Sequence, residues 1–203
     1  MDKKIDTFSA NSLKILDKST EEFKNKYIYN LSLFKKDKRA ILGQKFHTLI
    51  CYYINDFDVS KISLELNEKE RVIWENLKTI LKDEKENFIH TEYPFLIKND
   101  LNGWNYYLTG RYDAIHYKEN RYTIYDWKTL NLPKEPENDL QSIVYLYCAN
   151  KIFQSKNIKM RYLSIEKLDF IDIEFYDSDK YKKRIDEIIS KLKTSSTNDI
   201  IKY

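Results

Sequence analysis

Apolar residues recur at helical spacing over the first 87 positions of the chain. Leu42, Phe46, Leu49 and Tyr53, for example, lie on one stripe of a helix. The pattern predicts that residues 1–87 are mainly helical. The expected helices run from Ser9 or Asn11 to about Leu16, from about Thr20 to about Leu31, over Lys38–Asn55 and over Asn67–Lys85.

The pattern changes at position 88, where aromatic and β-branched residues alternate with polar ones. Pro94 lies inside the first alternating segment and favours an edge strand. Residues 88–203 are therefore predicted to form a sheet core with helices. The expected strands are Phe88–Ile97, Trp104–Tyr117, Arg121–Lys128, Met160–Ile165 and Asp169–Phe175, and the expected helices run from Asn138 or Asp139 to about Ile152 and over Asp177–Lys193.

This order of helices and strands favours an α/β sandwich over a doubly wound fold. A length of 203 residues suits one domain, and the sequence contains no internal repeat and no domain boundary. With three Gly and three Pro, the chain lacks the composition of a flexible linker. We therefore predict a single domain over residues 1–203.

The net charge of +3 neither requires nor excludes a nucleic-acid partner. No apolar run is long enough to cross a bilayer, and Met1–Ala10 has no signal-peptide pattern, so we expect a cytoplasmic protein without a membrane partner. Cys51 and Cys148 are too few and too isolated for a zinc site or an iron–sulfur cluster. Both cysteines are expected to be buried free thiols.

The candidate chemistry centres on Asp113, Asp126 and Lys128, which lie on two consecutive predicted strands. Alternate strand residues face the same way, so Asp126 and Lys128 project from one face. If the two strands form a hairpin, Asp113 lies near Asp126, and the two carboxylates repel each other. A divalent cation such as magnesium removes that cost, and a nearby lysine can orient the attacking water or stabilise charge on a phosphate.

The tripeptide D/E-x-K is weak evidence by itself, because it occurs four times in this lysine-rich chain. Three matches, Asp2–Lys4, Glu22–Lys24 and Asp83–Lys85, lie in a terminal tail or on predicted helices and are typical of solvated charge. Asp126–Lys128 alone lies in an apolar strand that follows a strand with its own acid. The structural alternative is that Asp126 and Lys128 form a surface ion pair.

Four motifs in this order resemble the RecB-type branch of the PD-(D/E)xK nuclease superfamily, which includes RecB nuclease domains and CRISPR-associated exonucleases. In that branch, G-x-x-x-H on a helix precedes G-x-x-D, D/E-x-K and Q-x-x-x-Y. The resemblance extends from about Ser9 to Tyr147. The matching segments are Gly43–His47, Gly110–Asp113, Asp126–Lys128 and Gln141–Tyr145.

The resemblance implies a restriction-endonuclease-like α/β core, with a mixed β-sheet flanked by helices and an N-terminal helical portion. It implies that His47, Asp113 and Asp126 bind Mg²⁺ or Mn²⁺ and that Lys128 is catalytic. Gln141 and Tyr145 would shape the site and contact the substrate backbone. Related nucleases often carry a glutamate near the position of Glu92, which could bind metal or support the lysine.

Each of these residues has a structural alternative. A histidine beside an apolar helical stripe, as His47 is, is usually a satisfied core residue. Gln141 and Tyr145, one helical turn apart, could simply pack their helix on the sheet. Glu92 could be an exposed strand residue. Arg111 shares strand parity with Asp113 and could face substrate phosphate at the rim of the site, but a plain salt bridge is an equal alternative.

The chain departs from the family in one respect. Many members hold a 4Fe–4S cluster through a Cys-Pro after the first helix and three cysteines near the C-terminus. The corresponding segments here, Asp17–Thr20 and Lys191–Tyr203, contain no cysteine, so we expect no iron–sulfur cluster. No G-x-x-x-x-G-K-[ST] motif of a helicase motor occurs either.

The functional prediction is a metal-dependent deoxyribonuclease that hydrolyses phosphodiester bonds. An exonuclease in DNA repair, recombination, phage replication or defence fits the resemblance, and the DNA could be single- or double-stranded. The protein could also be a subunit of a larger nucleic-acid-processing complex. Two alternatives remain open: a catalytically silent module of the same fold that binds nucleic acid or protein, and a nuclease that acts on RNA.

Overall fold

The fold is that of a computed structural model, which describes residues 5–31, 38–129 and 131–198. Within these ranges no helix is both long enough and apolar enough to span a membrane. The helices are α1 (Ala10–Lys18), α2 (Thr20–Phe23), α3 (Lys38–Ile54), α4 (Ser60–Leu64), α5 (Glu68–Lys82), α6 (Leu140–Phe153) and α7 (Ser178–Asn198), with a π-helical turn at Lys24–Ile28 and a 3-10 turn at Lys85–Asn87. The strands are β1 (Thr7–Phe8), β2 (Phe88–Leu101), β3 (Trp104–Lys118), β4 (Arg121–Lys128), β5 (Ile158–Ser164) and β6 (Phe170–Glu174).

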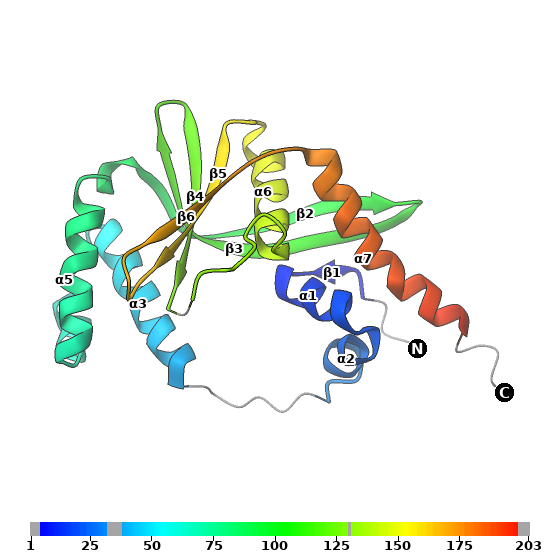
Figure 1. The fold of residues 1–203 in the computed structure, drawn as a ribbon, viewed down its shortest axis with the longest axis horizontal. Coiled ribbons are helices and arrows are strands. Elements are labelled where there is room, and N and C mark those ends of the chain that lie inside the picture. The colour runs from blue at the N-terminus through cyan, green and yellow to red at the C-terminus, as the bar shows by residue number, and fades with distance from the viewer. Residues whose placement is uncertain (1–4, 32–37, 130, 199–203) are drawn as a thin grey trace.

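The described strands form one mixed sheet in which β3 is the central element (Figure 1). The edge strand β2 runs antiparallel to β3 along almost its whole length. On its other edge, β3 pairs with β1 in parallel near its start and with β4 antiparallel near its end. β5 is parallel to β4, and β6 is antiparallel to β5. This arrangement confirms the predicted α/β core with a mixed sheet flanked by helices.

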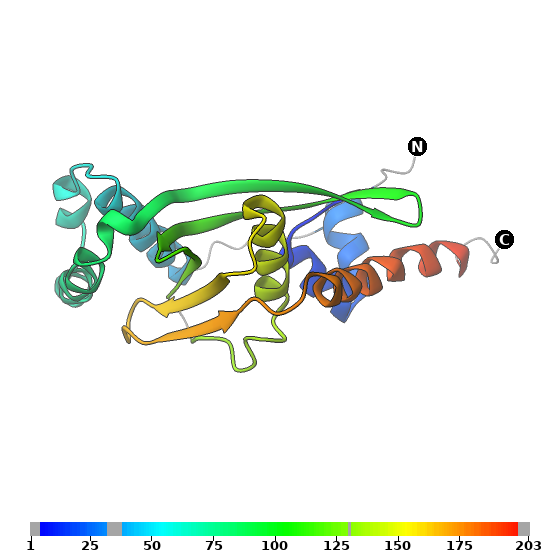
Figure 2. The ribbon, with the colours of Figure 1, turned by 90° about the horizontal axis from the view of Figure 1, so that it is seen from above.

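Two hydrophobic cores lie on opposite faces of the sheet. One contains Leu16 of α1, Val144 of α6 and Ile188 of α7, packed on β3, β4 and β5. The other contains residues of α3 and α5, including Leu49 and Leu77, packed on the C-terminal half of β3 and on β4. Figure 2 shows the long β2–β3 ribbon spanning both groups of helices. The sheet is thus buried on both sides where β4 runs through its middle.

Side-chain caps begin three helices where the sequence predicts them. The Ser9 hydroxyl accepts from the Ser12 amide at the start of α1, in a reciprocal capping box. Asn67 and Glu70 form a second such box at the start of α5. The Asp139 carboxylate accepts from the amide of Gln141, which sets the start of the helix that carries Gln141 and Tyr145.

The second predicted helix differs from the expectation. The α-helix ends at Phe23, and a π-helical turn follows, closed by a bond from the Tyr29 amide to the Lys24 carbonyl. Phe23 and Tyr27 still pack together, with ring centroids 5.0 Å apart, but Leu31 is exposed. Because a π turn holds more residues than an α turn, the expected apolar face does not continue to Leu31.

Three further features were missed or wrong. Strand β1 and helix α4 escape detection because two and five residues are too few to show a period. Cys148 is a buried free thiol as expected, but Cys51 is only partly buried. Its sulfur lies 3.2 Å from the Thr91 hydroxyl on β2, so α3 reaches the sheet edge at this point.

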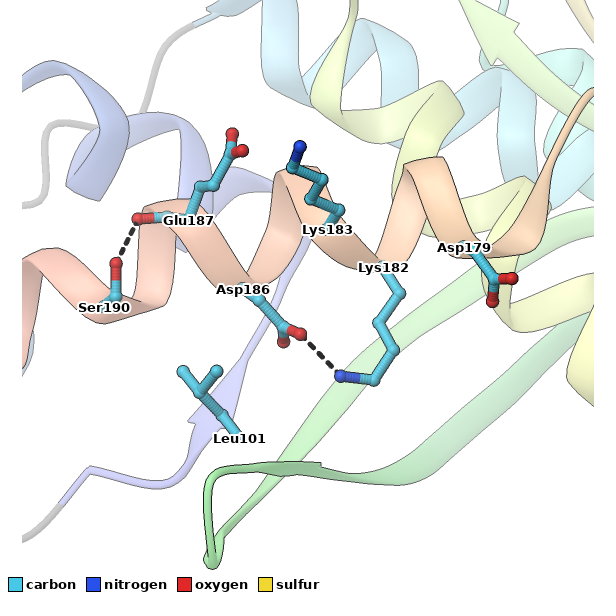
Figure 3. A pocket seen from close by; sticks show the side chains of 7 residues that line it. All are labelled: Leu101, Asp179, Lys182, Lys183, Asp186, Glu187 and Ser190. Atoms are coloured by element: carbon cyan, nitrogen blue, oxygen red, sulfur yellow. Dashed lines mark hydrogen bonds and ion pairs between the residues drawn. The ribbon is translucent and has the colours of Figure 1, made fainter.

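Helix α7 packs against the tip of the β2–β3 hairpin (Figure 3). Lys182 donates to the carbonyl of Asp100 at 3.0 Å, and the Tyr106 hydroxyl donates to Asp186 at 2.6 Å. A shallow pocket of about 410 Å³ lies between Leu101 and this helix. None of the residues that line this pocket is a predicted site residue. The pocket lies where α7 meets the hairpin.

Asp172 on β6 offers a test of the sheet's far edge. Burial raises the pKa of Asp172, but hydrogen bonds from Arg161 and Lys159 outweigh burial and hold the pKa below its ordinary value of 3.8. A carboxylate whose pKa is lower in the folded than in the unfolded state stabilises the fold at pH values above its unfolded-state pKa. This stabilisation is lost as the pH falls through the folded-state pKa. We predict that Asp172→Asn lowers the free energy of unfolding by about 1–2 kcal/mol at neutral pH.

Urea unfolding between about pH 7 and about pH 2 measures this effect. The difference between wild type and Asp172→Asn should shrink below about pH 4, as the wild-type carboxylate becomes protonated. Asp83→Asn, at the exposed end of α5, is the matched control and should change little at any pH. A difference that is independent of pH would show that the carboxylate charge is not what stabilises this edge.

Candidate metal centre

The predicted acids lie at a fork between β3 and β4. The two strands pair from Lys118–Arg121 to Ala114–Tyr125, and the pairing stops there. Asp113 and Asp126 are the next residues in register, and both are buried. Beyond the fork β4 continues alongside β5, and the Asp113 carboxylate accepts a hydrogen bond of 2.8 Å from the Trp127 amide. The acids therefore face each other across an opening in the sheet.

The β2–β3 ribbon changes face at the same place. Tyr112 and Ile115, which strict alternation would place on opposite faces, lie in the same core. On β2, Glu92 stands opposite Asp113, between the pairs Thr91–Ala114 and Tyr93–Tyr112, and has a left-handed backbone with φ of 50°. Such a conformation is uncommon for a residue other than glycine, and it interrupts the regular alternation of side chains along the strand. It re-aims Glu92 toward the fork.

His47, Glu92 and Asp113 form the group best suited to hold a metal ion. Their ligand atoms all lie within 4.8 Å of one another. His47 Nδ1 is 3.4 Å from Asp113 Oδ1, and Nε2 is 3.1 Å from the Trp127 carbonyl. A carbonyl only accepts hydrogen bonds, so Nε2 carries a proton and Nδ1 faces the carboxylates. A ring fixed by a carbonyl on one nitrogen, with the other free for metal, is the usual arrangement of a ligating histidine.

The chemistry of this donor set fits a divalent cation. Two carboxylates and an imidazole offer oxygen and nitrogen ligands to such an ion, which would keep further coordination positions for water or phosphate oxygens. Burial lowers the pKa of His47, but the hydrogen bond and charge of Asp113, the Trp127 carbonyl and the charge of Asp126 outweigh it and raise the pKa. The surrounding acids therefore create a demand for positive charge that a metal ion would meet.

Glu92 has its own basic partner. Arg111 Nη1 lies 2.7 Å from Glu92 Oε2, and 61% of the Arg111 side chain is exposed against 26% for Glu92. Burial raises the pKa of Glu92, the charge of Arg111 opposes this, and Asp113 adds to it. Of the two alternatives for Arg111, the structure contains the salt bridge. The partner is a candidate metal ligand, so the pair belongs to the site.

Asp126 and Lys128 are joined by Gln141 of α6. The Gln141 amide nitrogen donates to Asp126 Oδ1 at 2.5 Å, and its oxygen accepts from Lys128 Nζ at 2.9 Å. Lys128 Nζ also lies 2.7 Å from Asp126 Oδ2, outside the geometry of a good hydrogen bond. Burial and the charge of Asp113 raise the pKa of Asp126 to about 6, against the opposing effect of Lys128. The amide thus fixes the relative positions of acid and lysine.

Tyr145 supports the site from the next turn of α6. Its hydroxyl donates to the Arg111 carbonyl at 2.9 Å, and its own carbonyl accepts from the Tyr112 hydroxyl at 3.1 Å. These bonds tie α6 to the part of β3 that leads into Asp113. No contact with a substrate can be read from them, so the predicted substrate contacts of Gln141 and Tyr145 stay a prediction.

The sequence motifs name most of this group, and two contributions escaped them. The main-chain carbonyl of Trp127 contacts His47 and its amide binds Asp113, and no motif identifies a main-chain contact.

Gly43 is the first residue of the G-x-x-x-H motif, and a side chain there would come within 3.2 Å of the Thr129 hydroxyl. A small residue at this point of α3 therefore lets the helix that carries His47 approach the end of β4.

Gly110 is required for a different reason than backbone freedom. A Cβ at this position would lie 2.4 Å from the ring of Phe95, its partner on β2. That ring packs on Tyr112 and Tyr145, at centroid distances of 4.6 and 5.6 Å. We predict that Gly110→Ala lowers the free energy of unfolding by about 1–3 kcal/mol, because the ring must move into a packed cluster.

Thermal unfolding of Gly110→Ala and of the double variant Gly110→Ala/Phe95→Leu checks this prediction. In a chain of this size the single variant should melt several degrees below wild type. The smaller side chain at position 95 should then reduce the effect of the added methyl group, measured against Phe95→Leu alone. Additive losses in the double variant would show that the Phe95 ring is not the obstacle.

Comparisons with known proteins agree with this architecture. A family model described as the PD-(D/E)XK nuclease superfamily matches residues 59–200, which include the predicted site residues other than His47. The crystal structure of a protein named SSO0001 is similar to this chain, with a TM-score of 0.53 and 18% identity over 92% of this chain and 77% of that chain. At such low identity the likeness concerns the fold. No curated protein matches the sequence.

Proposed function

Because the chain belongs to the PD-(D/E)XK nuclease superfamily, we propose that it is a Mg²⁺- or Mn²⁺-dependent nuclease that hydrolyses the phosphodiester bonds of DNA. The observation that carries the proposal is the meeting of two groups at the fork between β3 and β4. His47, Glu92 and Asp113 offer a ligand set, and the Asp126–Lys128 pair lies on the strand beside it. Of the other D/E-x-K tripeptides, Asp2–Lys4 lies outside the described residues, and neither Glu22–Lys24 nor Asp83–Lys85 belongs to a group of potential metal ligands found among those that are described.

The site residues have two kinds of role: some would bind the metal ion, and others would act on the attacking water or the phosphate. His47, Glu92 and Asp113 would hold the metal, and we propose that Asp126, next to Asp113 at the fork, is a further metal-binding acid. A divalent cation bound there would polarise the scissile phosphate and stabilise the charge that develops on its oxygens. Lys128, with 28% of its side chain exposed, can reach an attacking water or a phosphate oxygen from the solvent side. Hydrolysis adds the water oxygen to phosphorus as the ester P–O bond breaks, and the leaving oxygen takes a proton.

The remaining residues would orient these groups. Gln141 forms a hydrogen bond with Lys128 and another with Asp126, so it limits the positions that the Lys128 ammonium can adopt. Tyr145 fixes the main chain at Arg111. We propose that both residues also border the substrate backbone, and that Arg111 faces phosphate. Such positioning matters because small displacements of reacting groups lower rates steeply.

Finer features of the proposal rest on the motif order. We propose that the protein is a RecB-type member without an iron–sulfur cluster, that residues 1–203 form one nuclease domain, and that it is an exonuclease. Repair, recombination, phage replication and defence are the settings that such an activity fits, in the cytoplasm and alone or as a subunit of a larger complex. The match of His47 to G-x-x-x-H supports the RecB-type assignment.

The direct test is degradation of labelled DNA by the purified full chain. Activity is expected with Mg²⁺ or Mn²⁺ and not with EDTA. Asp126→Asn and Lys128→Ala should each lower the rate about 100-fold or more, the scale of a lost acid–base or electrostatic contribution. Asp83→Asn removes the exposed acid of another D-x-K tripeptide, directly after α5, and should retain wild-type activity. Equal activity in all variants would refute the assignment.

Two further outcomes separate the alternatives. Manganese binding that depends on Asp113 but no hydrolysis of DNA or RNA would favour a catalytically silent module. Faster hydrolysis of RNA than of DNA of the same sequence, in direct competition, would replace the deoxyribonuclease with a ribonuclease. DNA cleavage that is lost in Asp126→Asn and Lys128→Ala supports the proposal as stated.

A further inference from the structure

Each acid of the site has a basic side chain as its partner. Glu92 pairs with Arg111 at 2.7 Å, Asp113 with His47 at 3.4 Å, and Asp126 with Lys128 at 2.7 Å. The three bases differ in exposure: the side chains of His47 and Lys128 are 27% and 28% exposed, and that of Arg111 is 61% exposed. Arg111 is therefore the partner that lies on the solvent side of the group.

The Arg111 side chain is exposed, whereas its main chain is held in the sheet. Its carbonyl accepts from the Tyr145 hydroxyl, and on β2 it is paired with Pro94, the second residue after Glu92. The guanidinium therefore extends to solvent from a strand that is hydrogen-bonded on both sides of the fork. A guanidinium binds a carboxylate and a phosphate with the same planar set of donors. Its present partner, Glu92, belongs to the group suited to a metal.

We propose that Arg111 is a built-in competitor of the metal ion for Glu92 and a receptor for substrate phosphate once the metal has displaced it. The inference rests on the proposed function. A cation with two charges among His47, Glu92 and Asp113 would take over the Glu92 carboxylate. The guanidinium then loses its partner and turns to a phosphate oxygen of the substrate. Metal and DNA therefore bind cooperatively, and each raises the affinity for the other by the same factor.

The competition has a modest expected size. Exposed ion pairs contribute little, so removal of the guanidinium should raise the affinity for Mn²⁺ about two- to fivefold in the absence of DNA. Removal should also weaken DNA binding in the presence of Mn²⁺, because a phosphate contact is lost. A residue that only positions Glu92 for the metal would do the opposite to Mn²⁺ affinity. The sign of the change therefore distinguishes the two roles.

The experiment measures Mn²⁺ binding to the full chain by calorimetry or by the electron paramagnetic resonance of free Mn²⁺. All proteins carry Lys128→Ala to prevent turnover, and each is titrated with and without a DNA oligonucleotide. Arg111→Gln is compared with Arg184→Gln, which removes an exposed arginine of α7 that pairs with Asp17 of α1 and with none of the site residues. Two further proteins add Glu92→Gln to this Lys128→Ala parent, one of them together with Arg111→Gln.

The expected results form one pattern. DNA raises the Mn²⁺ affinity of the parent and of Arg184→Gln. Arg111→Gln binds Mn²⁺ about two- to fivefold more tightly without DNA, and DNA adds much less. Glu92→Gln binds Mn²⁺ more weakly, and in that background Arg111→Gln changes nothing, because there is no carboxylate left to compete for.

Other results overturn the inference and show at which level it fails. If Arg111→Gln leaves Mn²⁺ affinity unchanged or weakens it while the parent binds Mn²⁺, the competition is refuted and the proposed nuclease stands. If Arg111→Gln has its full effect in the Glu92→Gln background, Glu92 is not the contested ligand and the inference is wrong. If the parent and the wild type bind no Mn²⁺, the proposed metal centre fails, and the inference fails with it.

Discussion

The mutual repulsion of three carboxylates is the constraint on which this structure depends. Glu92, Asp113 and Asp126 meet where the sheet opens, and two of them are buried. Charges of one sign at such distances in a poorly solvated place are unfavourable unless cations lie beside them. The chain supplies a base for each acid, yet burial and the charge of Asp113 still raise the pKa values of Asp126 and Glu92. A divalent cation at the fork would stabilise the charged forms of these carboxylates.

The fold brings these charges together through the divergence of two strands. Because β4 leaves β3 to run along β5, the side chains at the fork are released from the ladder and face one another. Helices from both layers then close the opening: α3 contributes His47 and α6 contributes Gln141. Packing of each helix in its own hydrophobic core fixes the distance between them, so the geometry of the site is a consequence of how the two cores are filled.

Much of this could be predicted from sequence, and the limits have physical causes. The parity of Asp126 and Lys128 follows from strand geometry, and the Asp139 cap places the helix of Gln141. The alternation of side chains along β2 could not place Glu92 in the site, because its left-handed backbone interrupts that alternation. Main-chain contacts of Trp127 and the short strand β1 leave no side-chain pattern at all. Local periodicity predicts regular elements, and the site lies where they become irregular.

The central claim is that His47, through Nδ1, belongs to the same metal centre as the acids. Electron spin-echo spectroscopy of the Mn²⁺-loaded protein tests it most directly, since it detects the coupling of Mn²⁺ to a coordinated nitrogen. The account predicts a coupling from one imidazole nitrogen that disappears in His47→Gln, while His116→Gln, at the Glu84 contact away from the fork, retains it. A nitrogen coupling that persists in His47→Gln, or Mn²⁺ bound without any nitrogen ligand, would contradict the account.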